Sequence, residues 1–346
     1  MTATDALLTL DDLQMRFTVG SGFLGRGGRR LAAVDHVSLA IARGETLGLV
    51  GESGCGKSTL GRCITRIHRP TGGRLDYRRS DGTTVDLATL GERELRPYWR
   101  EIRMIFQDPH ASLNPRMTLG DIVREPLKVN GTARGRALDD RVAELLTTVG
   151  LRPEHMKRYP HAFSGGQRQR VAIARALALQ PRLVVADEAV SALDVSVRAQ
   201  ILNLLADLQD EFALTLLFIS HDLSVVEHLC TRVAVMYLGR LVEVAPTQRL
   251  FERPRHPYTE ALLSAVPRIQ ASPGRPRERI ILRGDPPDAS RPPAGCAFHT
   301  RCRFAQDRCR TEQPALAEIE PGRQVACHFA GELALRGVAE QLPAAG

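Results

Sequence analysis

A glycine-rich stretch at residues 51–59, Gly-Glu-Ser-Gly-Cys-Gly-Lys-Ser-Thr, constrains the fold of this chain more than any other segment. It follows the apolar residues 46–50 and precedes residues 60–64, so it is predicted to lie where a buried strand turns into a helix. Glycines at such a turn let successive backbone N–H groups point at one anion without Cβ clashes. The stretch therefore predicts a phosphate-binding loop in an α/β fold.

Side chains in this loop have the chemistry that a nucleotide requires. Lys57 supplies a point charge for the β- and γ-phosphates, and Ser58 supplies a hydroxyl for Mg²⁺. Lysine is otherwise rare, since Lys57, Lys128 and Lys157 are the only lysines among 47 basic residues. A glycine-rich turn without a ligand is the alternative, and the flanking strand and helix argue against it. The residues expected to contact the nucleotide here are Gly51, Ser53, Gly54, Cys55, Gly56, Lys57, Ser58 and Thr59.

Polar residues follow three other predicted buried strands. Asp187 and Glu188 close one of them, Gln107 follows another, and His221 follows the third. Open α/β sheets bind ligands at the carboxyl ends of their strands. We expect Asp187 and Gln107 near Mg²⁺, Glu188 to polarise the attacking water, and His221 to bond the γ-phosphate. The ordinary alternatives are a helix cap, a loop glutamine in solvent and a structural histidine.

A helical pattern over residues 118–159 separates the two halves of the predicted sheet. It is followed by Ser-Gly-Gly-Gln at residues 164–167 and by a predicted helix over residues 169–179. Ser164 is expected to cap that helix, and glycines beside a helix amino terminus form a second anion site. The residues of this second site are Ser164, Gly165, Gly166 and Gln167.

Length and charge limit the class of protein only broadly. The 346 residues, 43% of them apolar, predict a folded protein of about two domains. The net charge is +8, and residues 251–310 contain 12 arginines against 6 acidic residues. Such a surface suits nucleic acid, an anionic membrane or an acidic partner. The first residues lack a basic stretch before an apolar segment, and no apolar run approaches ~20 residues, so a cytoplasmic protein is expected.

Together the motifs stand in the order and spacing of the ATP-binding-cassette (ABC) ATPases, which the chain resembles over residues 5–250. The resemblance implies a P-loop NTPase core with a mixed sheet and an inserted helical subdomain at about residues 108–170. It implies a head-to-tail dimer, in which the phosphate loop of one subunit and residues 164–167 of the other enclose each ATP. It adds Phe17 and Asp194 to the nucleotide site. Phe17 is expected to stack on adenine, and the alternative is a plain core residue. The motifs that carry the resemblance are residues 51–59, Gln107, residues 164–167, Asp187 with Glu188, residues 191–194 and His221.

One position departs from the family pattern. Glu188 is followed by Ala189, where these ATPases usually have proline. Alanine relaxes the backbone after the expected base, so slower hydrolysis is expected, although the carboxylate itself is kept.

The remaining segments resemble one subgroup of this family. Residues 256–263 and 295–298 look like the carboxyl-terminal extension of peptide- and nickel-importer ATPases, and residues 111–116 and 195–198 are similar to the same group. The whole chain looks closest to the second ATPase subunit of dipeptide and oligopeptide importers. The expected domains are residues 1–250 as the nucleotide-binding domain, residues 251–330 as the extension, and residues 331–346 as a tail.

The resemblance also implies function, partners and location. The chain is expected to hydrolyse ATP and power peptide uptake from the cytoplasmic face of the membrane. Its expected partners are a sister ABC ATPase in a heterodimer, two permease subunits and an extracytoplasmic peptide-binding protein. Nickel remains an alternative cargo. The rival class, a cassette ATPase acting on nucleic acid or ribosomes, is disfavoured by the single phosphate loop and by an aromatic content of 5%.

Four cysteines in the last part of the chain are candidate metal ligands. Cys296, Cys302, Cys309 and Cys327 are separated by five, six and seventeen residues. Thiolates so gathered could bind Zn²⁺ or a [4Fe–4S] cluster, and no pair has the short gap typical of zinc knuckles. The resemblance to the peptide-importer extension favours the cluster, with zinc and free thiols as alternatives. The other three cysteines, Cys55, Cys63 and Cys230, are expected to be buried apolar residues.

Overall fold

The chain forms two compact units. The first unit combines Met1–Thr89 with Ser220–Gly346, and the second is Leu90–Ile219. Both contain strands covered by helices, which confirms the predicted α/β class with a mixed sheet. Within the described part of the chain, no helix has the length and apolar character needed to cross a membrane. The computed structural model describes residues 6–19, 29–108, 112–266, 279–282 and 284–338.

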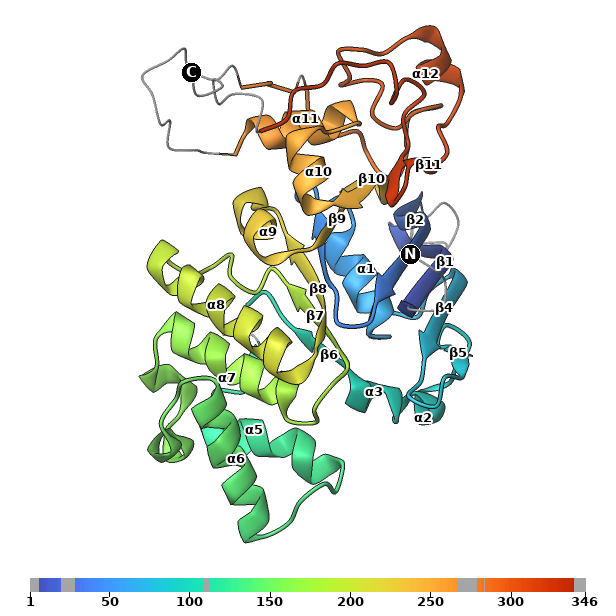
Figure 1. Ribbon diagram of the computed structural model, residues 1–346. Helices are drawn as coiled ribbons and strands as arrows, with labels where there is room; N and C mark the ends of the chain where they lie inside the picture. The colour runs from blue at the N-terminus through green and yellow to red at the C-terminus, as the bar shows by residue number, and fades with distance from the viewer. Residues whose placement is uncertain (1–5, 20–28, 109–111, 267–278, 283, 339–346) are drawn as a thin grey trace, which may run out of the picture. The chain divides into compact units, whose positions relative to one another are not determined.

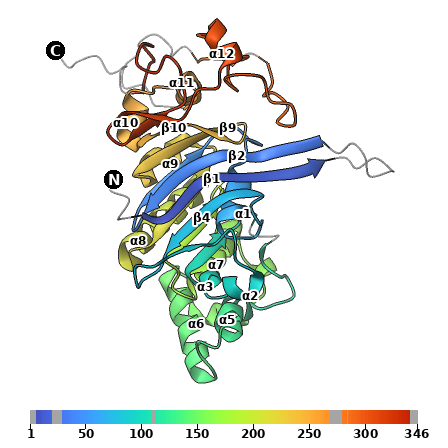
Figure 2. The same ribbon diagram turned by 90° about the vertical axis from the view of Figure 1, so that its right-hand side faces the viewer.

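An antiparallel sheet in the order β2-β1-β4-β5 forms one layer of the first unit. Figure 2 shows its two long strands, β1 (Ala6–Val19) and β2 (Arg29–Ala42), side by side. Strand β2 is as long as β1, because β1 pairs with it as far as Val19, which lies opposite Arg29. The sheet continues with the hairpin of β4 (Gly72–Arg78) and β5 (Thr84–Asp86).

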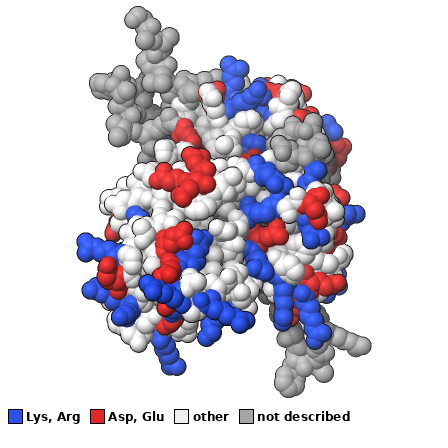
Figure 3. Space-filling view, turned by 60° about the horizontal axis from the view of Figure 1, so that its bottom comes forward, with Lys and Arg blue, Asp and Glu red and all other residues white. Residues whose placement is uncertain are grey.

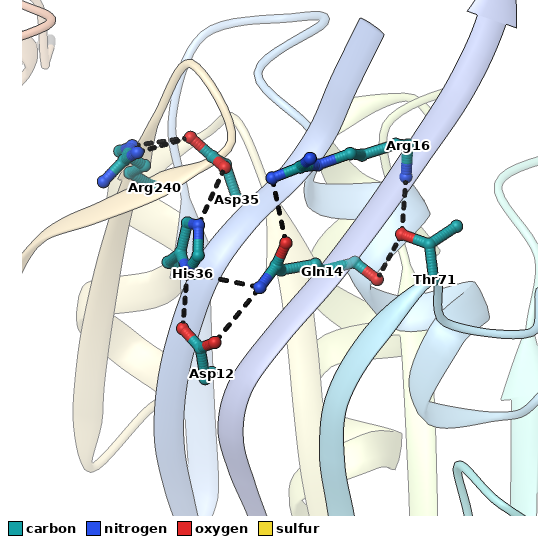
Figure 4. Close-up of polar contacts among 7 residues, drawn as sticks. All are labelled: Asp12, Gln14, Arg16, Asp35, His36, Thr71 and Arg240. Atoms are coloured by element: carbon teal, nitrogen blue, oxygen red, sulfur yellow. Dashed lines mark hydrogen bonds and ion pairs between the residues drawn. The ribbon is translucent and has the colours of Figure 1, made fainter. Parts of the chain in front are cut away.

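A polar network fixes the bend where β1 and β2 leave regular pairing (Figure 4). Asp12 and His36 both adopt left-handed backbone angles, with φ of 52° and 53°, which Asp and His tolerate better than most residues. Their side chains meet at 2.5 Å between Asp12 Oδ1 and His36 Nδ1, and this bond lowers the pKa of Asp12. Gln14 Nε2 donates to Asp12 Oδ2 at 3.1 Å, and Arg240 Nε donates to Asp35 Oδ2 at 2.7 Å. The network thus ties this sheet to the strand that carries Arg240.

The second sheet of the first unit carries the phosphate loop. Strand β3 (Thr46–Val50) is entirely buried, as its apolar sequence predicts, and pairs in parallel with β9 (Arg232–Tyr237). Strands β10, β12 and β11 continue the sheet from β9 in antiparallel pairing. Helix α1 (Lys57–Ile64) follows β3 and contacts β1 and β2. The other elements of this unit are α9 (Leu223–Leu229), β10 (Arg240–Pro246), α10 (Thr247–Glu252), α11 (Pro257–Ser264), α12 (Asp307–Thr311), β11 (Ala317–Glu320) and β12 (Arg323–Val325).

The second unit is built on three parallel strands in the order β6-β7-β8. Helix α7 packs on β6, and α8 packs on α7. The green helices of Figure 1 form a cluster in which α5 and α6 contact each other and α7. The elements are α2 (Glu92–Leu95), α3 (Tyr98–Glu101), β6 (Ile102–Ile105), α5 (Leu119–Val129), α6 (Arg136–Thr148), η2 (Pro153–Lys157), η3 (Pro160–Ala162), α7 (Gly165–Leu177), β7 (Leu183–Asp187), α8 (Val195–Phe212) and β8 (Thr215–Ser220).

Ion pairs neutralise many arginines of the carboxyl-terminal part. Figure 3 draws a different face, the one at the bottom of Figure 1, and there too basic and acidic side chains lie interspersed. Paired charges attract a polyanion much less than a uniformly basic surface does. The local arginine excess therefore does not by itself indicate a nucleic-acid surface. The pairs are Arg255–Glu320, Arg301–Glu52, Arg303–Glu260, Arg308–Glu312, Arg310–Asp307 and Arg323–Glu243.

Candidate nucleotide-binding site

The loop between β3 and α1 has the close backbone approaches that require glycine. A Cβ added at Gly51 would lie 2.2 Å from the Met236 carbonyl oxygen, and one at Gly56 would lie 2.0 Å from that of Ala33. Gly56 also has φ of 107°, a left-handed angle that other residues adopt only with strain. Helix α1 starts directly afterwards, at Lys57. The loop is therefore a tight turn at a helix amino terminus, and its form fits an anion cradle.

Lys57 is held inside this loop. Its side chain is buried, with 4% exposed, and Nζ donates to the carbonyl oxygens of Gly51 at 2.8 Å and Glu52 at 2.9 Å. Ser58 and Thr59, on the first turn of α1, are half-buried, whereas Ser53 and Gly54 are exposed at the tip. A cation fixed among carbonyl groups of its own loop is placed to donate hydrogen bonds to phosphate oxygens.

Cys55 and the other two core cysteines are buried, as predicted. Burial raises the pKa of the Cys55 thiol and raises the pKa of Cys63 to about 12. Burial also raises the pKa of Cys230. All three therefore remain neutral thiols at physiological pH and serve as small apolar groups.

In the second unit, Glu188 and Gln107 lie in direct contact. Gln107 Nε2 donates to Glu188 Oε2 at 2.9 Å, although the two residues are 81 positions apart. Glu188 has a left-handed φ of 47°, and the Ser191 hydroxyl donates to its carbonyl oxygen at 2.9 Å. Asp187 ends strand β7 with 2% exposed. An amide that bonds one carboxylate oxygen orients the other, which is what a base that positions water requires.

The Ser-Gly-Gly-Gln segment opens helix α7 with a capping box. Ser164 Oγ accepts from the Gln167 N–H at 3.3 Å, and Gln167 Oε1 accepts from the Ser164 N–H at 3.1 Å. This confirms the predicted cap, and the helix begins at Gly165 rather than at residue 169. A Cβ at Gly166 would lie 2.3 Å from Val197 Cγ1, so helix packing requires glycine there. The exposed Asp194 occupies the amino-terminal cap position of α8.

The remaining expected site residues belong to the first unit. Phe17 on β1 is half-buried, and its ring meets the His68 ring edge-on with 5.6 Å between centroids. His221 is exposed and directly follows β8. Within each unit the site residues thus lie at strand ends or helix starts, as expected. Their joint action on one nucleotide stays a prediction, as does the domain boundary at residue 250.

The four carboxyl-terminal cysteines line one small cavity. Cys296, Cys302, Cys309 and Cys327 surround a space of about 20 Å³ together with His299 and His328. Burial raises the pKa of Cys302 to about 12 and of Cys327 to about 11, so these groups are neutral thiols in this arrangement. Over the described ranges, no group of three or more His, Cys, Asp or Glu side chains is arranged to hold a metal ion. The donor set suits an iron–sulfur cluster, whereas the space has room for about one water molecule.

Two contacts of the phosphate loop join it to residues far away in the sequence. Glu52 accepts both guanidinium bonds of Arg301, and its N–H donates to the hydroxyl of Tyr258. Arg301 lies 249 positions from Glu52, and Tyr258 lies 206 positions away. No local pattern encodes such pairs, although a carboxylate inside an anion-binding loop is a signal that a cation is needed nearby.

Comparison with known families and proteins matches both parts of the chain. Residues 34–191 match the ABC transporter family, and residues 242–309 match the oligopeptide/dipeptide transporter C-terminal region. The solved ATP-binding cassette MJ0796, in a dimeric post-hydrolysis state bound to ADP and Pi, is 29% identical with a TM-score of 0.61, covering 69% of this chain and 98% of that one. CbiO1 from Clostridium perfringens, part of the cbiONQ transporter complex, is 28% identical with a TM-score of 0.59. The match covers 71% of this chain and 91% of CbiO1. The chain therefore belongs to the ABC transporter family of ATP-binding proteins.

Relatives that match this chain over nearly their whole length show to which group of the ABC transporter family it is similar. The oligopeptide transport ATP-binding protein AppF of Bacillus subtilis is 50% identical over 94% of this chain and 98% of its own length. The probable peptide ABC transporter ATP-binding protein y4tS of Sinorhizobium fredii is 52% identical over 94% of this chain and 90% of its own length. The predicted resemblance to the peptide-importer group of ABC ATPases is thus confirmed.

Proposed function

We propose that this protein is the ATP-hydrolysing subunit of an importer for dipeptides or oligopeptides. One observation carries the proposal: a well-formed phosphate loop and the oligopeptide-transporter C-terminal region occur on the same chain, in contact with each other. Relatives named for peptide transport match nearly its whole length. We expect it to act at the cytoplasmic face of the membrane, where two permease subunits and an extracytoplasmic peptide-binding protein complete the transporter.

Each group in the site has a distinct part in hydrolysis. The loop residues that cradle the phosphates are Gly51, Ser53, Gly54, Cys55, Gly56 and Thr59. Lys57 neutralises the β- and γ-phosphates, and Phe17 stacks on the adenine. Ser58, Gln107 and Asp187 would hold Mg²⁺, which neutralises developing phosphate charge.

Water attack completes the reaction. Glu188 accepts the proton of the attacking water or orients that water in line with the γ-phosphate. His221 bonds the γ-phosphate and so holds the reacting group in place. The Gln107 amide, already bonded to Glu188, keeps the carboxylate turned toward the water.

A second subunit supplies the other side of the nucleotide. We expect a sister ABC ATPase to form a heterodimer with this chain, each subunit presenting its capped α7 start to its partner's ATP. In this chain the residues concerned are Ser164, Gly165, Gly166, Gln167 and Asp194. The capping box supports this role, because it keeps the N–H groups at the start of α7 in a fixed direction.

Transport by the assembled complex tests the proposed function. The subunit, its sister, both permeases and the binding protein are reconstituted in vesicles, with this chain on the accessible side. We expect MgATP to drive uptake of a labelled dipeptide or oligopeptide, and a non-hydrolysable ATP analogue to drive none. Uptake of Ni²⁺ but not of peptides would contradict the peptide assignment. Absence of any ATP-dependent transport by an intact complex would contradict the class.

The cysteine cavity supports a separate expectation, a [4Fe–4S] cluster. Four thiols that line one space provide the right donor set. Anaerobically purified protein should be brown, with broad absorption at about 400 nm. Cys302→Ser and Cys327→Ser should lose this absorption, whereas Cys63→Ser, at a buried core position, should keep it. Colourless protein with one bound zinc, or with free thiols only, would contradict the cluster.

A further inference from the structure

An ion pair joins the carboxyl-terminal extension to the phosphate loop. Arg301 Nη1 donates to Glu52 Oε2 at 2.7 Å, and Nη2 donates to Oε1 at 3.1 Å. The Arg301 side chain is 6% exposed and that of Glu52 is 28% exposed, so the pair is largely shielded from water. A two-pronged guanidinium–carboxylate bond fixes direction as well as charge. Arg301 therefore orients the Glu52 side chain.

The backbone of Glu52 is held as well. Its N–H donates to the hydroxyl of Tyr258 at 2.8 Å, and its carbonyl oxygen accepts from Lys57 Nζ at 2.9 Å. Tyr258 is fully buried at the start of α11. Two of the three groups that hold this loop residue thus come from the carboxyl-terminal part, and the third is the loop's own lysine.

Arg301 is itself placed by the cysteine-containing turn. Its N–H donates to the carbonyl oxygen of Phe298 at 3.0 Å. The Phe298 ring packs on Tyr258 at 5.4 Å and on Tyr237 at 5.3 Å between centroids. The next residue, Cys302, lines the cysteine cavity. The position of the guanidinium therefore depends on the folding of the extension.

The negative charge of Glu52 makes this contact relevant to ATP binding. A carboxylate within a loop that binds a triphosphate repels the ligand, because like charges a few ångströms apart interact strongly near a protein surface. The Arg301 fork neutralises Glu52 and fixes its carboxylate by a defined bond. Loss of the guanidinium would leave an uncompensated negative charge within the phosphate loop.

We propose that Arg301 is a positioning residue for ATP: it holds Glu52 so that the phosphate loop keeps its anion-binding form, and it thereby makes ATP affinity depend on the carboxyl-terminal extension. The inference rests on the proposed ATPase function and adds to it a residue outside the ATPase motifs.

Steady-state ATP hydrolysis by the heterodimer with the sister subunit, and MgATP titration of the full-length chain, test the proposal. Arg301→Gln should raise KM and Kd for ATP about tenfold, which corresponds to about 1.4 kcal/mol, while kcat changes less than about twofold. Arg301→Lys keeps the charge but loses the fork, so it should raise KM by only about threefold. The double variant Glu52→Gln/Arg301→Gln should bind ATP better than Arg301→Gln, because no carboxylate remains to repel the phosphates.

Arg303→Gln is the matched control. Arg303 Nη2 lies 2.9 Å from the buried Glu260, so this pair also anchors the extension, but it does not reach the phosphate loop. Its KM should stay within about twofold of the unmodified protein. Equal effects of Arg301→Gln and Arg303→Gln on KM would overturn the proposal. An unchanged KM in Arg301→Gln would overturn it too, as would a double variant that binds ATP as weakly as Arg301→Gln. If Arg301→Gln does not fold, Arg301→Lys decides: an unchanged KM overturns the proposal.

The same titration separates this inference from the proposed function. Lys57→Ala should abolish ATP binding whether or not Arg301 matters. Unmodified protein that binds no MgATP would contradict the ATPase function itself. Binding that is lost in Lys57→Ala but unchanged in Arg301→Gln would contradict the positioning role alone.

Discussion

Glu188→Gln is expected to retain MgATP binding and to lower kcat by about 10²- to 10⁴-fold. The substitution replaces the carboxylate that polarises water by an amide of the same shape. The amide oxygen can still accept the Gln107 Nε2 bond, which is 2.9 Å long in this structure, so the local geometry should survive. Binding without turnover should trap the ATP-bound dimer with the sister subunit, which size-exclusion chromatography with MgATP would detect.

Glu211→Gln provides the matched control for that variant. Glu211 is exposed near the end of α8 in the same unit, and the substitution removes the same charge. Its kcat should equal that of the unmodified protein. Normal turnover in Glu188→Gln would contradict the assignment of Glu188 as the base, while loss of ATP binding would indicate a structural role instead.

Arg323→Met is expected to lower the free energy of unfolding by about 3–5 kcal/mol at pH 8. Arg323 and Glu243 form a fully buried ion pair at 2.6 Å, with 2% and 0% of their side chains exposed. Removal of the guanidinium leaves the Glu243 carboxylate buried with only hydrogen bonds, such as those from the Arg255 and His256 N–H groups. Chemical denaturation monitored by circular dichroism measures the loss. Arg308→Met, which breaks the exposed pair with Glu312, should cost less than about 1 kcal/mol.

The loss in Arg323→Met should depend on pH in a defined direction. Burial raises the pKa of Glu243, and Arg323 opposes this rise. Without Arg323 the folded-state pKa rises further above the unfolded value, so stability is lost as the pH increases through the folded pKa. The variant should therefore be less destabilised at pH 5 than at pH 8. An equal loss at both pH values would show that Glu243 does not carry the penalty.

Local sequence patterns predicted the elements that carry the chemistry. The apolar run before the phosphate loop is the buried β3, and the buried strand predicted directly before His221 is β8. Ser164 caps α7 as expected, but the helix starts earlier than predicted. Glycine disfavours helix interiors, and here the capping box compensates for two glycines in the first turn.

Contacts between distant segments could not be predicted in the same way. The bond between Gln107 and Glu188 and the pair of Arg301 with Glu52 depend on tertiary packing. The four carboxyl-terminal cysteines show the same limit of prediction from sequence. Their spacing made them candidate ligands of one metal site and left the cluster, zinc and free thiols open, and only the fold places all four around one cavity.

The chemical state of Cys55 has a practical consequence. The phosphate loop contains this thiol 3.8 Å from Lys57 Nζ, yet burial raises its pKa, so the reactive thiolate is scarce at neutral pH. Alkylating reagents and peroxides should therefore spare the nucleotide pocket. A spectroscopic probe could accordingly be attached to a cysteine engineered on the surface, and the labelled transporter should still hydrolyse ATP.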